Sequence, residues 1–167
     1  MPIDRDSFRQ VLGHFAAGVT VVTTVNKEGA PYGLTATAFT SVSLDPPLVL
    51  VCVDRKSETH PHFAAAGVFA VNFLAYGQEE LSRRFAVSGG EKFREVAHSR
   101  GVTGAPLLEG TVGYVECELR QAVEAGDHTI FIGEVVNARC ATPETGGRTQ
   151  APTPLLYYRG RYHRLAD

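Results

Sequence analysis

Hydrophobic and polar positions alternate with different periods along this chain, and each period predicts a different kind of element. Near the start, apolar residues recur at the i, i+3, i+4 and i+7 spacing of one helix face: Phe8, Val11, Leu12 and Phe15. This spacing predicts a helix that ends near Gly18. Most of the remaining chain consists of short apolar or β-branched runs between turn residues, which is the pattern of strands joined by turns.

The predicted strands share a high content of Val, Ile, Leu, Phe and Thr and have turn residues at their ends. They cover 19–25, a segment that runs through residue 37 after the 26–29 turn, 48–53, 68–74, 110–125, 129–141, 155–158 and 162–165. Short helices are expected at about 59–66 and 78–86. The Gly-rich and charged residues 88–109 indicate a surface excursion, and the Pro- and Gly-rich residues 142–153 a loop.

Six or seven mostly antiparallel strands with few helices favour a closed β-barrel over an α/β sheet. The sequence also has no G-x-G-x-x-G after a first strand, which argues against a Rossmann site. Its length of 167 residues predicts a single domain, 1–167, and 44% hydrophobic residues are ordinary for a globular protein.

Charge and targeting features exclude several classes of function. The formal net charge of -2 gives no electrostatic reason to bind nucleic acid or an anionic membrane. No apolar run approaches the length of a membrane span, and the first residues have no apolar signal region. The cysteines Cys52, Cys117 and Cys140 are far apart and are predicted to be inert core thiols. These features together predict a cytoplasmic protein.

The segment from Gly33 to Ser43 (GLTATAFTSVS) is unusual because it combines small residues with several hydroxyls. Small side chains let a flat ligand approach the backbone, and hydroxyls supply hydrogen bonds without the desolvation cost of a charge. An aromatic cofactor with polar edges has these needs. An ordinary Thr-rich strand on a half-exposed sheet explains the same composition equally well.

A second segment, at the end of the predicted strand 48–53, favours a phosphate site. The basic residue Lys56 and the hydroxyl of Ser57 precede a predicted helix start, with Arg55 and Thr59 as possible helpers. Cationic groups, O–H donors and free backbone N–H groups together suit an anionic phosphate. The alternative is a solvated strand end.

The order of these two segments resembles the flavin reductase family, the small NAD(P)H:flavin oxidoreductases. Further segments resemble that family in the same order: 8–25, 68–74 (VFAVNFL), 82–86 (SRRFA), 126–135 (GDHTIFIGEV) and 154–162. The resemblance implies a mainly β fold, the FMN-binding split β-barrel, which is an antiparallel Greek-key barrel with a few short helices.

The resemblance also implies a catalytic residue, His128, at the tight corner after Asp127. The matching histidine lies beside the flavin, where it would hold the nicotinamide carboxamide or ease charge at the reduced flavin. From the residues alone, a turn histidine that merely tolerates the geometry is the favoured interpretation, and only the resemblance reverses it. The pair His60 and His62 lacks helical ligand geometry and a carboxylate or cysteine partner, so no metal site is expected.

The flavin ring is expected along one segment and against the strand that precedes the phosphate site. The implied contacts are Leu34, Thr35, Ala36 and Thr37, with Ser41 on the same segment, and the backbone of Cys52 and Val53. Arg84 and Phe85 would cover the flavin tail or ring edge, although an amphipathic helix explains them as well. Tyr158 would contact the nicotinamide or a neighbouring subunit, or would be a barrel tyrosine with a satisfied hydroxyl.

By resemblance, the chain reduces free FMN or FAD with NADH or NADPH and supplies the reduced flavin to a flavin-dependent monooxygenase. The family is dimeric, so a C2 homodimer is expected. Two other functions are compatible with the sequence: a split-barrel oxidase with tightly bound FMN, and a non-catalytic flavin- or haem-binding module. The sequence does not distinguish FMN from FAD, or NADH from NADPH.

Overall fold

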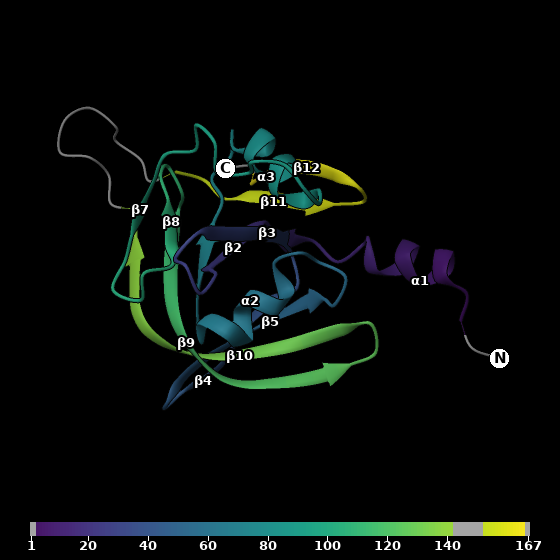
Figure 1. Ribbon diagram of the computed structural model, residues 1–167. Coiled ribbons are helices and arrows are strands. Elements are labelled where there is room, and N and C mark those ends of the chain that lie inside the picture. The colour runs from purple at the N-terminus through teal and green to yellow at the C-terminus, as the bar shows by residue number, and fades with distance from the viewer. Residues whose placement is uncertain (1–2, 142–151, 166–167) are drawn as a thin grey trace.

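A computed structural model describes residues 3–141 and 152–165 of the chain (Figure 1). Its helices are α1 (Arg5–Leu12), α2 (His60–Ala66) and α3 (Glu79–Ala86). The mainly β fold with a few short helices, predicted from the sequence, is confirmed. Most of the loop predicted at 142–153 lies outside the described residues.

Seven strands form one antiparallel sheet. They are β2 (Thr20–Val25), β3 (Pro31–Ala36), β4 (Phe39–Leu44), β5 (Pro47–Asp54), β6 (Val68–Phe73), β9 (Gly113–Ala125) and β10 (His128–Cys140). Their spatial order is β3-β2-β6-β9-β10-β5-β4, so strands far apart in the sequence pair with each other. The hydroxyl-rich segment therefore divides into two strands at opposite ends of the sheet, with Thr37 and Ala38 between them.

The two longest strands, β9 and β10, bend strongly along their length (Figure 1). Their pairing register shifts between Ile132 and Gly133 and again between Val135 and Asn137. Such bulges bend a strand and increase its twist. Gly133 also lets β10 pass close to Phe69, because a Cβ there would lie 2.5 Å from the Phe69 ring. The curvature folds the sheet around its apolar face, as a split barrel requires.

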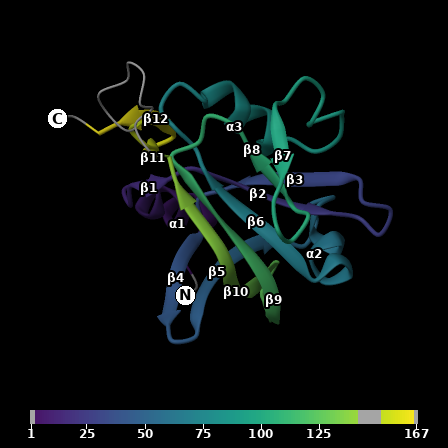
Figure 2. The ribbon, with the colours of Figure 1, turned by 90° about the vertical axis from the view of Figure 1, so that its left-hand side faces the viewer.

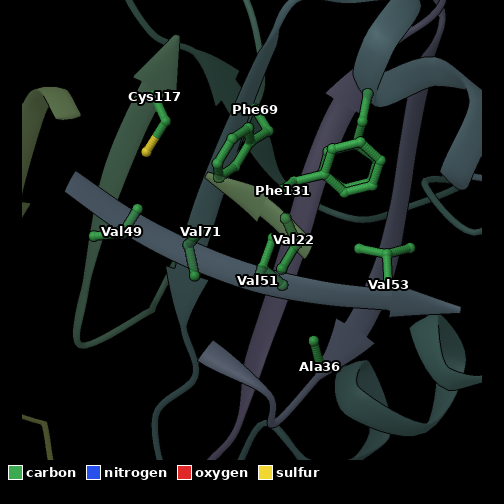
Figure 3. Packing of buried hydrophobic residues seen from close by; sticks show 10 residues of the cluster. Val22, Ala36, Val49, Val51, Val53, Phe69, Val71, Cys117 and Phe131 are labelled. Carbon is green, nitrogen blue, oxygen red and sulfur yellow. The ribbon is translucent and has the colours of Figure 1, made fainter. Parts of the chain in front are cut away.

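The main core fills the inside of this curved sheet (Figure 3). Alternate residues of β5 point inward, so that Val49, Val51 and Val53 are buried. Helix α2 contributes Phe63, whose ring stacks on Phe131 at a centroid distance of 4.7 Å.

A smaller layer lies beside β2 and β3. It consists of α3 and a three-stranded sheet of β1 (Ala17–Gly18), β11 (Leu155–Tyr158) and β12 (Arg161–Arg164). In both ribbon views α3, β11 and β12 lie at the same end of the molecule (Figures 1 and 2). Helix α3 is attached to β3 because the Thr35 hydroxyl donates a hydrogen bond to the Ser82 carbonyl at 2.6 Å. The buried Phe85 belongs to a second apolar cluster in this layer.

The opening helix is shorter than predicted and packs differently. Helix α1 begins after Asp4, whose carboxylate accepts hydrogen bonds from two backbone N–H groups of the first turn, and ends at Leu12 rather than near Gly18. Residues 17–18 instead pair with β11 as strand β1. The apolar face of α1 is largely exposed, with Val11 65% accessible, and the helix extends away from the body (Figure 1).

The prediction that residues 88–109 form a surface excursion is wrong for the second half of that segment. Residues His98–Arg100 (β7) and Pro106–Leu108 (β8) form a hairpin that buries Leu107 and Leu108. The turn of this hairpin lies against the sheet because it binds Glu116, a fully buried residue of β9. Its carboxylate accepts hydrogen bonds from the backbone N–H and the hydroxyl of Thr103 at 2.9 and 2.8 Å. This carboxylate holds the hairpin turn against the sheet.

Two further features of the described residues complete the fold. None of the helices in ranges 3–141 and 152–165 is long and apolar enough to cross a membrane.

The prediction that all three cysteines are core thiols is correct only for Cys117, because Cys52 is half-buried and Cys140 is exposed. Side chains alternate along β5, so Cys52 points away from the face that buries its neighbours Val51 and Val53.

Candidate functional site

An open pocket of about 360 Å³ lies where several elements end. Its walls come from the end of β3 and the residues after it, the end of β5, the end of α3 with the following loop, and the start of β10. The volume lies within the usual range for small-molecule sites. The site is therefore built from element ends that the sheet order brings together.

One wall is the segment 34–38, where β3 leaves the sheet. The small residue Ala38 is exposed and leaves the backbone here accessible, whereas Ala36 is buried in the main core; the Ala38 carbonyl accepts a hydrogen bond from the Cys52 N–H at 3.0 Å. Thr37 is exposed here, whereas the Thr35 hydroxyl is already bonded to α3. This wall suits a flat ring that contacts backbone and small side chains.

The turn after β5 places a cationic and a hydroxyl side chain at one end of the pocket. The Asp54 carboxylate accepts a hydrogen bond from the Lys56 N–H at 2.8 Å, and the Asp54 carbonyl accepts one from the Ser57 N–H at 2.9 Å. These bonds hold the turn so that Lys56 and Ser57 both line the pocket. Arg55 instead lies 3.9 Å from Glu124, outside the pocket wall. An ammonium and a hydroxyl at one end favour a phosphate there.

A second cationic residue, Lys92, also lines this pocket. It was not among the predicted site residues. Its side chain is only 8% exposed and pairs with Glu58 at 2.7 Å. The hydrogen bond from Lys92 is the main reason that the pKa of Glu58 lies below its ordinary value. No local pattern predicts this position, because Lys92 belongs to a Gly-rich segment and reaches the pocket through contacts distant in sequence.

His128 is the first residue of β10 and lies opposite Asp54 in the strand pairing. Its Nδ1 is 2.7 Å from a carboxylate oxygen of Asp127. Hydrogen bonding to His128, followed by its charge, holds the pKa of Asp127 below its ordinary value. Since Asp127 occupies Nδ1, the other ring nitrogen remains available to a ligand in the pocket.

The pocket brings together nine of the predicted residues: Leu34, Thr35, Ala36, Thr37, Cys52, Lys56, Ser57, Phe85 and His128. It also contains residues that the sequence analysis did not select: Ala38, Asp54, Ala86, Val87, Ser88 and Lys92. Ala86, Val87 and Ser88 directly follow the predicted Phe85, so extending that segment would have found them.

Five predicted residues lie outside the pocket wall: Ser41, Val53, Thr59, Arg84 and Tyr158. Val53 is buried in the core, and the buried Thr59 donates its hydroxyl to the Gly33 carbonyl at 3.0 Å. Arg84 donates to the Arg94 carbonyl at 2.8 Å.

The other two lie elsewhere on the sheets. Ser41 pairs with Val49 at the end strand β4, and the Tyr158 ring lies 6.1 Å from that of His14.

The curved antiparallel sheet is compatible with a split-barrel protein, and its pocket joins a wall of small residues to an end that contains Lys56 and Ser57. The described residues fit a flavin nucleotide, because small residues line the ring wall and Lys56 and Ser57 stand at the anionic end. Comparison with known proteins agrees: the family model "Flavin reductase like domain" matches residues 12–166. The chain belongs to this flavin reductase family.

Individual relatives cover nearly the whole chain. The protein "Flavin reductase (NADH)" of Kitasatospora aureofaciens is 43% identical over 97% of this chain and 82% of its own length. The reductase component of a 4-nitrophenol and 4-nitrocatechol monooxygenase from Rhodococcus opacus is 41% identical, covering 96% and 81%. The solved structure of the NADH:FAD oxidoreductase of Streptomyces globisporus C-1027 is 42% identical with a TM-score of 0.86, covering 100% of this chain and 96% of that one.

Proposed function

We propose that this protein uses NADH or NADPH to reduce free FMN or FAD and releases the reduced flavin to a separate flavin-dependent monooxygenase. The observation that carries the proposal is that one pocket contains three features: a wall of small residues suited to a flat ring, a cationic end and His128. The relatives support it, since two are named as NADH-dependent flavin reductases and one as the reductase component of a monooxygenase.

The chain's own residues would bind and orient the two reactants. Lys56 and Ser57 hold the flavin phosphate, and Thr37 and Ala38 lie along the ring. His128, fixed by Asp127, positions the nicotinamide carboxamide. The flavin supplies the hydride-accepting chemistry, so no protein acid or base is required for the transfer. The pocket is open and has few charged residues, which suits a flavin that exchanges with solution.

We also propose that two copies form a C2 homodimer. The apolar face of α1, with Phe8, Val11 and Leu12, is exposed. An apolar hollow of about 450 Å³ lies at the base of this helix and includes Phe15 and Phe39. A second copy would cover both, because an apolar surface of this kind on a chain of this size marks an interaction site.

The cellular setting follows from the chemistry. We place the protein in the cytoplasm, where thiols stay reduced, because Cys52, Cys117 and Cys140 are all free. The partner is expected to be a flavin-dependent monooxygenase, with neither nucleic acid nor membrane involved.

Measuring the loss of NADH and of NADPH under air, with and without added FMN or FAD, tests the proposal. We expect nicotinamide oxidation that depends on added flavin. Retention of a yellow flavin through gel filtration without nicotinamide oxidation would instead identify an oxidase with tightly bound FMN. Flavin or haem binding without any turnover would identify a binding module.

A further inference from the structure

Two histidines at the start of helix α2 lie outside the wall of the flavin pocket. His60 is the first residue of α2, and Pro61 after it fixes the backbone of the first turn. The His62 ring packs against Tyr32 of β3 at a centroid distance of 3.8 Å. The His60 ring reaches β10 instead. The two histidines therefore contact different strands, and only His60 contacts the strand on which the catalytic histidine lies.

The side chain of His60 is fixed against the start of β10. Its Nε2 lies 2.8 Å from the hydroxyl oxygen of Thr129, which is a hydrogen-bond distance. Thr129 is buried, so this bond is shielded from water on the side of the strand. The His60 ring also packs against Phe131, the next inward-facing residue of β10, at a centroid distance of 5.3 Å. These two contacts hold the first turn of α2 and the first residues of β10 together.

Alternation along β10 places Thr129 directly behind His128. Neighbouring residues of a strand point to opposite faces, so His128 lines the pocket while Thr129 is buried on the inner face. The pairing with β5 shows the same division, because Asp54, which lies opposite His128, also lines the pocket. The backbone that carries His128 is therefore held from the inner face by His60, whereas Asp127 holds the His128 ring itself.

The turn that carries Lys56 and Ser57 does not depend on the His60 side chain. Both residues are held through their backbone N–H groups, which donate hydrogen bonds to the carboxylate and the carbonyl of Asp54. Only the backbone N–H of His60 contacts this turn, as a donor to the Ser57 carbonyl at 3.0 Å. Loss of the imidazole should therefore disturb His128 and leave the cationic end of the pocket in place.

The electrostatics of His60 argue against a direct contact with an anion. Burial, followed by the charge of Arg55, holds the pKa of His60 below its ordinary value of 6.5, while Asp54 and Glu124 oppose this shift. The imidazole is therefore largely uncharged at pH 7. Its Nε2 is already occupied by Thr129. A neutral ring that is bonded inward is suited to fixing a strand rather than to binding a phosphate.

We propose that His60 is a positioning residue for flavin reduction, acting through Thr129 on His128. This rests on the proposed function, in which His128 orients the nicotinamide. The hydrogen bond fixes the first residues of β10 behind the exposed corner 126–127, so that the His128 ring keeps one position relative to a flavin in the pocket. Hydride transfer depends steeply on such positioning, since a displacement of about 1 Å can slow a reaction by up to about 100-fold.

Removing the hydrogen bond from either side tests this role. His60→Ala removes the imidazole, and Thr129→Val removes only the hydroxyl while keeping the shape of a buried side chain. Anaerobic stopped-flow with saturating NADH gives the rate constant of flavin reduction, and quenching of flavin fluorescence gives the Kd for FMN and FAD. We expect reduction about tenfold slower in both variants, with each Kd changed less than about twofold.

Conservative and control variants separate the hydrogen bond from general damage to the fold. Thr129→Ser keeps a hydroxyl and should restore reduction to within about threefold of the wild type. His62→Gln alters the other histidine of the same helix turn, outside the pocket wall, and should reduce flavin at the wild-type rate. Lower thermal stability of Thr129→Val with an unchanged rate constant would show a structural role only and would overturn the proposal.

The double variant His60→Ala/His128→Ala shows whether His60 acts through His128. We expect it to reduce flavin at the rate of His128→Ala alone, within about twofold, because the ring that His60 positions is already gone. Losses that multiply would show an independent role, and a raised flavin Kd with normal reduction would move the effect to the turn after β5; either result would overturn the proposal. Wild-type protein that oxidises no NADH with added flavin would contradict the proposed function itself, and the role of His60 would fall with it.

Discussion

Replacing His128 by alanine separates a role in the reaction from a role in the fold. The side chain is 42% exposed and its partner Asp127 is 87% exposed, with 2.7 Å between Nδ1 and the carboxylate oxygen. Exposed polar contacts of this kind contribute little to folding. The thermal stability of His128→Ala should therefore stay close to that of the wild type.

The effect on hydride transfer should be much larger. Loss of a positioning contact on the nicotinamide is expected to lower kcat/KM for the nicotinamide about 10- to 100-fold, or about 1.4–2.7 kcal/mol of transition-state stabilisation. A misplacement of about 1 Å is sufficient to produce a loss of this size. Flavin affinity should hardly change, because Lys56 and the 34–38 wall remain in place.

Anaerobic stopped-flow reduction of the flavin and thermal unfolding should be measured on the same preparation. His163→Ala is the matched control, since His163 is exposed on β12 and lies outside the pocket wall. A normal reduction rate in His128→Ala would remove His128 from the site. Lower stability with unchanged kinetics would identify it as a structural turn residue.

Three other expectations test different parts of the molecule. Lys56→Ala combined with Ser57→Ala should weaken FMN binding by about 1.5–3 kcal/mol and spare riboflavin; titration showing equal losses would mean that the pair only shapes the turn. Burial raises the pKa of Glu116, but hydrogen bonds led by Thr103 outweigh this and lower it below its ordinary 4.5. Its contribution to stability is therefore present above that value and lost as pH falls through the folded pKa, so urea unfolding of the wild type and Glu116→Gln should converge on acidification. Val11→Asp on α1 should yield a monomer in sedimentation analysis, and a wild type that is itself monomeric would exclude the dimer.

The parts of the site that could be predicted depend on local patterns. Alternation along the strands, small residues after β3 and turn chemistry after β5 are all visible in a few consecutive residues. They point to the segments that contain Ala36, Thr37, Lys56 and Ser57, and the family resemblance then predicted that these segments share one site. The short helices α2 and α3 were found for the same reason, since their apolar spacing and flanking residues are local.

The remainder depends on contacts that no local pattern shows. Lys92 enters the pocket only because Glu58 and the Gly33 carbonyl hold it there. Glu116 is a charged residue of the kind expected on the solvent-facing side of a strand. It is nevertheless buried, because the 101–104 turn folds over it. Helix α1 has a clear apolar face, yet periodicity does not say whether the helix packs on its own chain or remains exposed for a partner.

The most direct test of the proposed function counts how many flavins each protein molecule reduces. Purified protein is mixed anaerobically with NADH and a large molar excess of FAD over protein, and the bleaching of the oxidised flavin is followed to completion. We expect all of the flavin to be reduced, at a rate proportional to protein concentration, because the flavin enters and leaves as a substrate. Bleaching that stops at one flavin per chain would contradict a diffusing flavin, and no bleaching at all would contradict flavin reduction by this protein.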